Sequence, residues 1–125
     1  QRPGEDNSLG KIKFLFNNQS SVYLHDTPAK AAFNQPVRAV SHGCVRVEKP
    51  LELAQALFGT GAKFEQIKKG MDSDDPKAED IALPAKIPVY LSYFTCWKDS
   101  NSGGLKFVKD VYGLDAVLYT HLTRI

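Results

Sequence analysis

The chain has 125 residues, of which 42% are hydrophobic and 24% are charged, and its formal net charge is +2. This composition is typical of one globular domain, and it excludes a dedicated nucleic-acid-binding protein, because no block of Lys and Arg supplies the basic surface. It also excludes a membrane span within this chain, which needs about 18 consecutive apolar residues, and a disulfide-dense scaffold, which needs more than two cysteines.

The first part of the chain predicts a β-hairpin followed by a short helical segment. Residues 1–10 are polar and interrupted by Gly and Pro, which is typical of a loose arm. Polar and apolar residues alternate at the start of 11–16, and 22–25 is a second predicted strand. The Asn- and Ser-rich stretch between them favours a turn, and 28–33 predicts one or two helical turns.

Two helices are predicted next along the chain. Pro50 suits the first position of a helix, and apolar residues then recur at helical spacing until Gly59 ends the pattern. Residues 62–69 predict a second, shorter helix that ends at Gly70. The acidic and polar run 71–80 that follows is typical of a solvated loop.

The last third of the chain predicts a second hairpin. The stretch 87–97 is rich in Val, Ile, Tyr and Phe and predicts one long strand, in which Cys96 is interpreted as a small buried apolar residue. Residues 98–104 are predicted to form the loop and 105–109 the returning strand. The tail 113–125 mixes signals and predicts no particular element.

The segment 34–47 has little helical periodicity and carries one conspicuous string, Ser41-His42-Gly43-Cys44-Val45-Arg46. A thiol becomes a useful nucleophile only as a thiolate, so it needs a base or a positive charge nearby. His25, His42 and Arg46 are candidates for these roles. A glycine before the cysteine permits a tight backbone, whose amides could stabilise a developing oxyanion.

Together with Tyr23-x-His25 upstream, this string resembles the signature of the YkuD-type L,D-transpeptidase catalytic domain. The His-Asp-Thr-Pro run at 25–28 and the helix from Pro50 are similar to the larger-domain branch of that family, and the resemblance extends over roughly 11–97. It implies a mainly β fold of the α+β class. In such a fold a mixed β-sheet forms the core, and two or three helices pack after the cysteine motif.

The resemblance also implies a function, which is the cross-linking of peptidoglycan stem peptides in the bacterial cell envelope, at the periplasm or cell surface. In this family the cysteine attacks the carbonyl of the third residue, a diamino acid, of a tetrapeptide stem and releases D-Ala. An amine of another stem then resolves the thioester into a 3→3 cross-link, although some members attach a lipoprotein instead. The family needs no metal or other cofactor, and carbapenems acylate its cysteine.

Carried onto this chain, the resemblance makes Cys44 the nucleophile and His25 the general base, with the backbone carbonyl of Asp26 orienting the imidazole. The spacing of the motif also favours His25 over His42. In an extended backbone the Cα atoms of His42 and Cys44 are about 7 Å apart and their side chains run parallel. A base supplied from across the fold therefore reaches the thiol more easily.

The resemblance gives the other motif residues supporting roles. His42 and Gly43 are expected to shape the oxyanion hole. Arg46 is expected to fix the motif loop or to bind a substrate carboxylate through its planar guanidinium. The remaining predicted substrate-binding residues are Tyr23, Ser41 and Asp26. A zinc site of Cys44, His25 and His42 is disfavoured, because no fourth ligand stands at a recognisable spacing.

Two other functions fit the same residues. A cysteine peptidase that hydrolyses cell-wall peptides would use the same nucleophile and base, with water instead of an amine reaching the thioester. A catalytically inactive peptidoglycan-binding domain would be favoured if Cys44 proved buried or lay away from His25. The transpeptidase and the peptidase differ in which acceptor reaches the thioester, which depends on pocket shape and on the exclusion of water.

The resemblance predicts an incomplete domain. Several strands precede the Tyr-x-His strand in this family, whereas only 11–16 precede it here. We therefore expect 1–125 to be a single domain, the C-terminal portion of an L,D-transpeptidase catalytic domain. A sheet that lacks strands leaves an uncovered edge, through which a second copy of the chain could pair.

Overall fold

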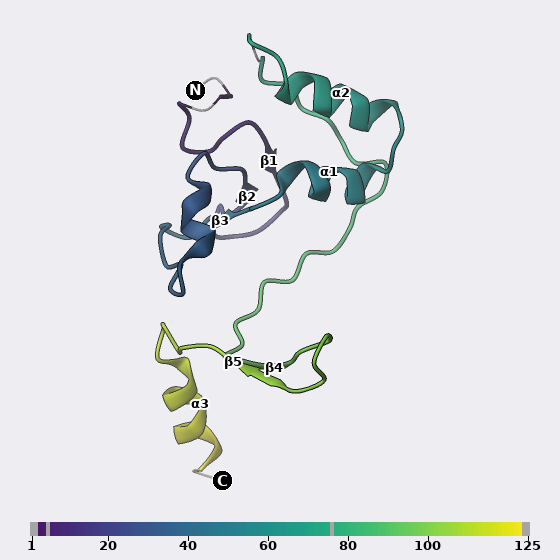
Figure 1. Ribbon diagram of the computed structural model, residues 1–125. Coiled ribbons are helices and arrows are strands. Elements are labelled where there is room, and N and C mark those ends of the chain that lie inside the picture. The colour runs from purple at the N-terminus through teal and green to yellow at the C-terminus, as the bar shows by residue number, and fades with distance from the viewer. Residues whose placement is uncertain (1–2, 5, 76, 124–125) are drawn as a thin grey trace. The chain divides into compact units, whose positions relative to one another are not determined.

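The computed structural model describes residues 3–4, 6–75 and 77–123, which group into two compact units, Gln1–Val89 and Tyr90–Ile125 (Figure 1). Among the described residues, two small sheets, three α-helices and one 3₁₀ helix make up the regular structure, so the predicted α+β class is confirmed. None of the helices in the described part of the chain is long and apolar enough to cross a membrane.

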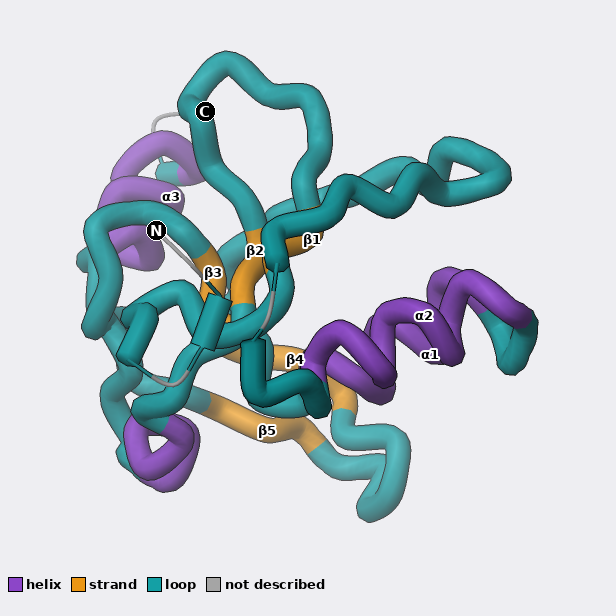
Figure 2. Tube along the Cα trace, turned by 90° about the horizontal axis from the view of Figure 1, so that it is seen from above, coloured by secondary structure: helices purple, strands orange, loops and turns teal. Residues whose placement is uncertain are grey.

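The first unit contains a three-stranded sheet in the order β1–β2–β3 (Figure 2). Strands β1 (Lys13–Phe14) and β2 (Leu24–His25) pair antiparallel, which confirms the predicted hairpin. Strand β3 (Val45–Arg46) pairs parallel with β2. Parallel strands need a crossover connection, and residues 26–44 provide it. The crossover contains the 3₁₀ helix η1 (Lys30–Asn34), where a helical turn was expected.

The strands β1 and β2 are shorter than predicted because the side chain of Asn18 replaces part of the hairpin ladder. Its amide nitrogen donates to the carbonyls of Phe16 (3.0 Å) and Val22 (2.7 Å). Its amide oxygen accepts from the backbone amides of Ser20 and Val22, both at 3.0 Å. Backbone groups that bind this side chain are not available to pair strand with strand.

Helices α1 (Pro50–Phe58) and α2 (Ala62–Met71) follow the sheet, as predicted. Pro50 occupies the first turn of α1, and Gly59 ends it with a φ of +72°. The prediction that α2 ends at Gly70 is wrong, because α2 continues to Met71 and Gly70 takes an ordinary helical conformation. Glycine weakens a helix but does not by itself terminate one.

The core of the first unit lies between these helices and strand β1. Its buried hydrophobic residues are Ala54, Phe64 and Ile67. The partly buried side chains that pack against them are Ile12, Phe14, Leu51, Phe58, Met71 and Ile81. The segment expected to be a loose arm differs from that expectation. Asn7 is buried there, and the Gly10 amide donates to the Asn7 carbonyl at 2.7 Å.

The second unit consists of the hairpin β4 (Cys96–Lys98) and β5 (Leu105–Phe107) and the helix α3 (Leu114–Leu122). The hairpin is confirmed, but the long strand predicted over 87–97 is wrong, since only its last two residues belong to β4. Aromatic and β-branched composition does not make a strand where no partner strand runs alongside. The interpretation of Cys96 as buried is also wrong, because its side chain is exposed.

Helix α3 is the element that the sequence did not predict. The apolar residues of α3 are distributed around its whole circumference, so its sequence shows no amphipathic pattern. The carboxylate of Asp110 accepts from the backbone amides of Leu114 (3.1 Å) and Asp115 (2.8 Å), and this interaction stabilises the start of the helix. Within the described residues 90–123, no side chain is buried.

Candidate active site

The parallel pairing of β2 with β3 brings the two halves of the motif together. Leu24 pairs with Val45 and His25 with Arg46, so the next pair back along the strands is Tyr23 with Cys44. Side chains alternate between the faces of a sheet. The side chains of four motif residues therefore lie on one face of the sheet, namely Tyr23, His25, Cys44 and Arg46. Tyr23 and His25 precede the crossover in the chain, and Cys44 and Arg46 follow it.

His25 is only 4% exposed and is held in one orientation by the backbone. Its Nδ1 lies 2.5 Å from the carbonyl oxygen of Asp26. A carbonyl oxygen only accepts hydrogen bonds, so Nδ1 must carry the proton in this contact. In the neutral imidazole, Nε2 is then the unprotonated nitrogen that can take up a proton.

Tyr23 links the histidine to the cysteine. Its ring meets the imidazole of His25 edge-on, with 5.9 Å between the ring centroids. The ammonium of Lys13 lies 5.6 Å from the centroid of the same ring. Burial and the neighbouring Cys44 side chain raise the pKa of the half-buried Tyr23 phenol. The phenol therefore keeps its proton at neutral pH and can donate a hydrogen bond to a thiolate.

The loop before Cys44 is closed by the hydroxyl of Ser41. That hydroxyl donates to the carbonyl of Cys44 at 2.5 Å and accepts from the amide of Gly43 at 3.2 Å. Gly43 has a φ of +141°, a conformation that side chains with a Cβ rarely adopt. Cys44 is a free, half-buried thiol at the end of this loop, and His42 is exposed within it.

Arg46 is half-buried beside the motif loop, and its guanidinium is only partly used. One terminal nitrogen donates to the carbonyl of Val40 at 3.4 Å. Its Nε is buried without a hydrogen-bond partner among the described residues. A buried donor without an acceptor is costly, so this nitrogen is a locally destabilising feature beside the motif loop.

The carboxylate of Asp26 is engaged inside the protein. It accepts from the backbone amide of Lys11 at 3.0 Å and from the ammonium of Lys30 at 2.8 Å. Burial alone would raise the pKa of Asp26, but these hydrogen bonds and one from the Thr27 amide lower it overall. Lys30 was not predicted as a site residue, because Asp26 lies before the predicted helical segment 28–33 and no helical spacing therefore relates the two.

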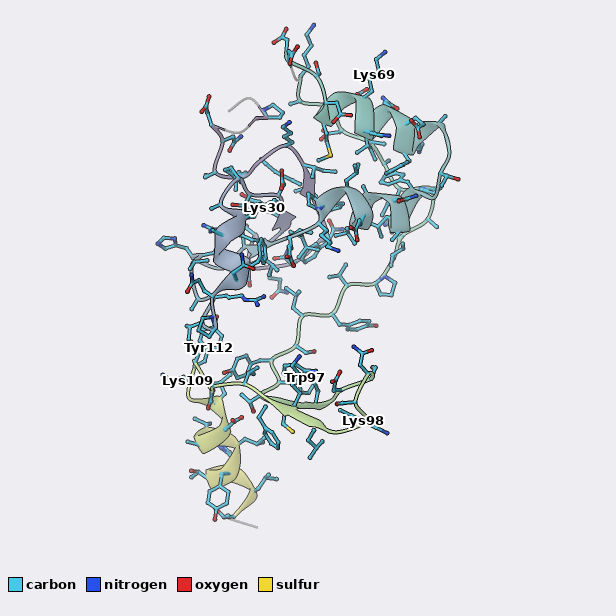
Figure 3. The ribbon with its side chains drawn as sticks, in the orientation of Figure 1. Lys30, Lys69, Trp97, Lys98, Lys109 and Tyr112 are labelled. Carbon is cyan, nitrogen blue, oxygen red and sulfur yellow. The ribbon has the colours of Figure 1, made fainter. Side chains whose placement is uncertain are left out.

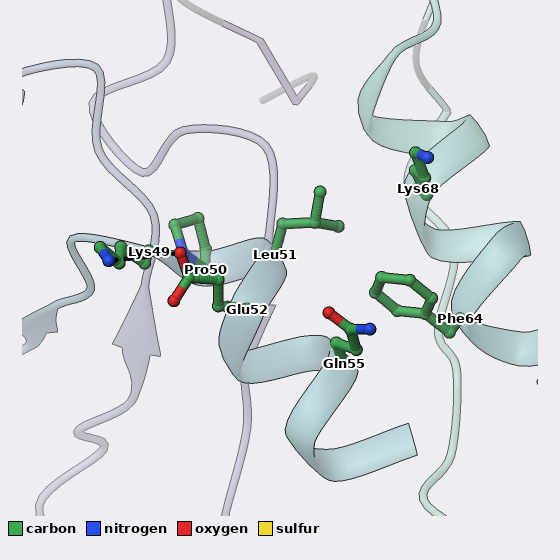
Figure 4. A pocket seen from close by; sticks show the side chains of 7 residues that line it. All are labelled: Lys49, Pro50, Leu51, Glu52, Gln55, Phe64 and Lys68. Carbon is green, nitrogen blue, oxygen red and sulfur yellow. Dashed lines mark ion pairs between the residues drawn. The ribbon is translucent and has the colours of Figure 1, made fainter. Parts of the chain in front are cut away.

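One cavity of the first unit is lined by residues other than the cysteine. It has a volume of about 470 Å³ and lies along α1 and α2, where Leu51, Gln55 and Phe64 form part of its wall (Figure 4). Neither Cys44 nor His25 lines it. In the part of the chain that the structure describes, no three His, Cys, Asp or Glu residues are grouped to hold a metal ion.

Comparison with known proteins identifies the family. Residues 1–72 match the model of the L,D-transpeptidase catalytic domain named YkuD. A protein of Haemophilus influenzae named "Putative L,D-transpeptidase" is 36% identical to this chain over 110 residues. The alignment covers 88% of this chain and 22% of that protein, so the chain spans about a fifth of the relative's length. The chain belongs to the YkuD L,D-transpeptidase catalytic domain family.

Proposed function

We propose that this chain carries the catalytic residues of a peptidoglycan L,D-transpeptidase, with Cys44 as the nucleophile and His25 as the general base. The observation that carries the proposal is the contact between His25 Nδ1 and the Asp26 carbonyl, at 2.5 Å. This contact leaves Nε2 as the basic nitrogen on the sheet face that Cys44 shares. The position of Tyr23 against both side chains supports the same assignment.

In the first half of the reaction, the Cys44 thiol gives its proton to His25 Nε2, and the thiolate attacks the carbonyl carbon of the diamino acid at position three of a tetrapeptide stem. The C–N bond to the terminal D-Ala breaks, and the leaving amine takes the proton from His25. A thioester remains on Cys44. The phenol of Tyr23, whose pKa is raised, donates to the thiolate before the attack.

The oxyanion formed during this step needs backbone donors close to Cys44. The Gly43 amide donates to Ser41 Oγ, so the Cys44 amide is the better placed of the two amides at this point in the loop. His42 lines the exposed side of the same loop. The planar guanidinium of Arg46, one terminal nitrogen of which donates to the Val40 carbonyl at 3.4 Å, suits a substrate carboxylate, which such a group binds through two hydrogen bonds.

In the second half, the side-chain amine of another stem attacks the thioester carbonyl and forms a 3→3 cross-link, which releases Cys44. These steps need no metal or other cofactor. Because peptidoglycan is the substrate, we place the enzyme in the bacterial cell envelope, in the periplasm or at the cell surface.

The experiment that tests this proposal is intact-mass measurement after incubation with a carbapenem. The chain offers a matched control, because it has two free cysteines, the half-buried Cys44 and the exposed Cys96. We expect one covalent adduct on the native chain and on Cys96→Ala, and none on Cys44→Ala. An adduct on Cys44→Ala, or none on the native chain with its thiols free, contradicts the proposal.

A second assay separates transfer from hydrolysis. With a tetrapeptide stem as donor, a transpeptidase releases D-Ala and gives a cross-linked dimer whose yield rises with the concentration of the acceptor amine. A hydrolase instead gives a tripeptide at a yield that the acceptor does not change. The second result would replace the transpeptidase by a cell-wall peptidase that uses the same Cys44 and His25.

A further inference from the structure

Lys30, which is labelled on η1 in Figure 3, joins three segments of the first unit through one ammonium group. Its Nζ donates to Asp26 Oδ1 at 2.8 Å, to the carbonyl of Val47 at 3.2 Å and to the carbonyl of Glu48 at 2.8 Å. An ammonium has three donors, so these acceptors use all of them. Although the side chain is 45% exposed, its charged end is therefore committed to the protein and not to a ligand.

Asp26 is fixed from the other side as well. Its side chain is 10% exposed, and its Oδ2 accepts from the amide of Lys11. Its own amide donates to the carbonyl of Ile12 at 2.9 Å. Gly10 packs so closely that a Cβ added there would lie 2.3 Å from Asp26 Oδ2. The residue that follows His25 is thus held by the segment before β1, by η1 and by the end of β3.

The position of this residue decides the state of His25. The Asp26 carbonyl is the group that binds the protonated Nδ1. If the Asp26 peptide rotated, its carbonyl would no longer accept a hydrogen bond from Nδ1 of His25. The proton could then reside on Nε2 instead. A histidine with its proton on Nε2 cannot accept one there. The carboxylate of Asp26 therefore acts on His25 indirectly. Its contacts with Lys11 and Lys30 fix the Asp26 backbone, and the backbone carbonyl in turn orients the imidazole.

We propose that Lys30 and the carboxylate of Asp26 are positioning residues, which hold the Asp26 peptide so that its carbonyl keeps His25 in the tautomer with a bare Nε2. The proposal rests on the proposed role of His25 as the base. It assigns the Asp26 side chain to the protein's own framework, and it adds Lys30, which neither the cysteine motif nor the Tyr-x-His strand contains.

The test measures the tautomer and the acylation rate in the same full chain. The ¹⁵N shifts of the His25 imidazole report which nitrogen carries the proton, and mass spectrometry gives the carbapenem acylation rate. In Lys30→Met we expect Nδ1 to lose its protonation preference and the maximal acylation rate to fall about tenfold or more. The carbapenem concentration that gives half the maximal rate should stay unchanged, because the pair does not touch the ligand.

Two further variants keep the test decisive. Lys49→Met removes another lysine that forms an ion pair, an exposed one with Glu52 at 3.3 Å, and should change the rate by less than about twofold. The double variant Asp26→Asn with Lys30→Met leaves no unpaired buried charge, so it serves where Lys30→Met alone does not fold. A folded double variant with the native tautomer and acylation rate overturns the proposal.

The outcomes also separate this proposal from the proposed function. A native chain that is not acylated contradicts the function, and the imidazole shifts of the native and Lys30→Met chains then decide the positioning role alone. A native chain acylated at Cys44, together with a Lys30→Met chain that is acylated as fast and has the same tautomer, contradicts only the positioning role.

Discussion

The units Gln1–Val89 and Tyr90–Ile125 differ in what holds them together. The first has a buried hydrophobic core that includes Phe64, and it also buries His25 and Asp26. In the second, none of the described residues 90–123 is buried, and Phe107 is 71% exposed. The residues that match the family, 1–72, all fall in the first unit. The cysteine motif thus belongs to the unit that has a buried core.

The second unit is held by contacts between exposed side chains. The Tyr93 hydroxyl donates to Asp110 Oδ1 at 2.6 Å, and the rings of Tyr93 and Tyr112 lie 5.1 Å apart. Such contacts shape a hairpin and a helix but remove little apolar surface from water. The order of the candidate site is thus supported by a buried core, while the second unit depends on hydrogen bonds and ring contacts between exposed side chains.

Truncating a core phenylalanine should give the largest effect. Phe64 is 7% exposed, and Phe64→Ala should lower the free energy of unfolding by about 3–5 kcal/mol, because it leaves a cavity. The matched control Phe107→Ala should change it by no more than about 0.5 kcal/mol. Chemical denaturation followed by circular dichroism measures both. Equal losses would mean that the second unit folds around a core of its own.

Adding a methyl group beside Asp26 should give the next largest effect. Gly10 has a φ of +63°, and its added Cβ would overlap Asp26, so Gly10→Ala should lower the free energy of unfolding by about 2–3 kcal/mol. Gly70→Ala meets nothing within 4 Å and lies in α2, where it should stabilise the fold by about 0.5–1 kcal/mol. Thermal or urea unfolding distinguishes the expected loss of stability in Gly10→Ala from the expected gain in Gly70→Ala. A tolerated Gly10→Ala would contradict the close packing around Asp26.

Removing the carboxylate that begins α3 should give a smaller and local effect. Asp110→Ala removes the acceptors for the amides of Leu114 and Asp115 and should destabilise α3 by about 1 kcal/mol. Amide hydrogen exchange over 114–122 measures it, with the hairpin-loop variant Asp99→Ala as control. Loss of protection in β2 as well would show that the two units are energetically coupled, which would contradict their separate stabilisation.

The smallest expected effect is the pH dependence that Asp26 contributes. Burial would raise the pKa of Asp26, but hydrogen bonds from Lys30 and the Lys11 amide leave it below its ordinary value of 3.8. The ionised form therefore stabilises the folded state. That contribution is complete above the unfolded pKa and is lost as pH falls through the folded one. Urea unfolding between neutral pH and pH 3 should show a shallower decline in Asp26→Asn, and an unchanged decline would contradict the assignment.

Local features of the fold could be predicted from the sequence. Pro50 and Gly59 mark the ends of α1, and the polar stretch after Phe16 marks the first hairpin, because such signals act within a few residues. The long strand over 87–97 was wrong because strand formation needs a partner that composition does not supply. Helix α3 was missed because its start depends on Asp110, which lies outside the helix.

The candidate site could be predicted in its parts but not in its assembly. The residues of the cysteine motif and His25 were selected from their types and spacing. The parallel register that sets His25 beside Arg46 joins residues far apart in the chain, and no local pattern specifies it. Lys30 was missed for a similar reason, since two of its three acceptors, the carbonyls of Val47 and Glu48, lie beyond the crossover.

The parallel pair β2–β3 also makes the thiol a reporter of folding. The isolated hairpin of β1 and β2 contains His25 but not Cys44, and the two come onto neighbouring strands only after a loop of roughly twenty residues closes. Before that closure, Cys44 shares no sheet face with Tyr23 and with the proposed base His25. The rate at which Cys44 reacts during refolding should therefore rise in one late step, together with the burial of His25 and not with the formation of α1 or α2.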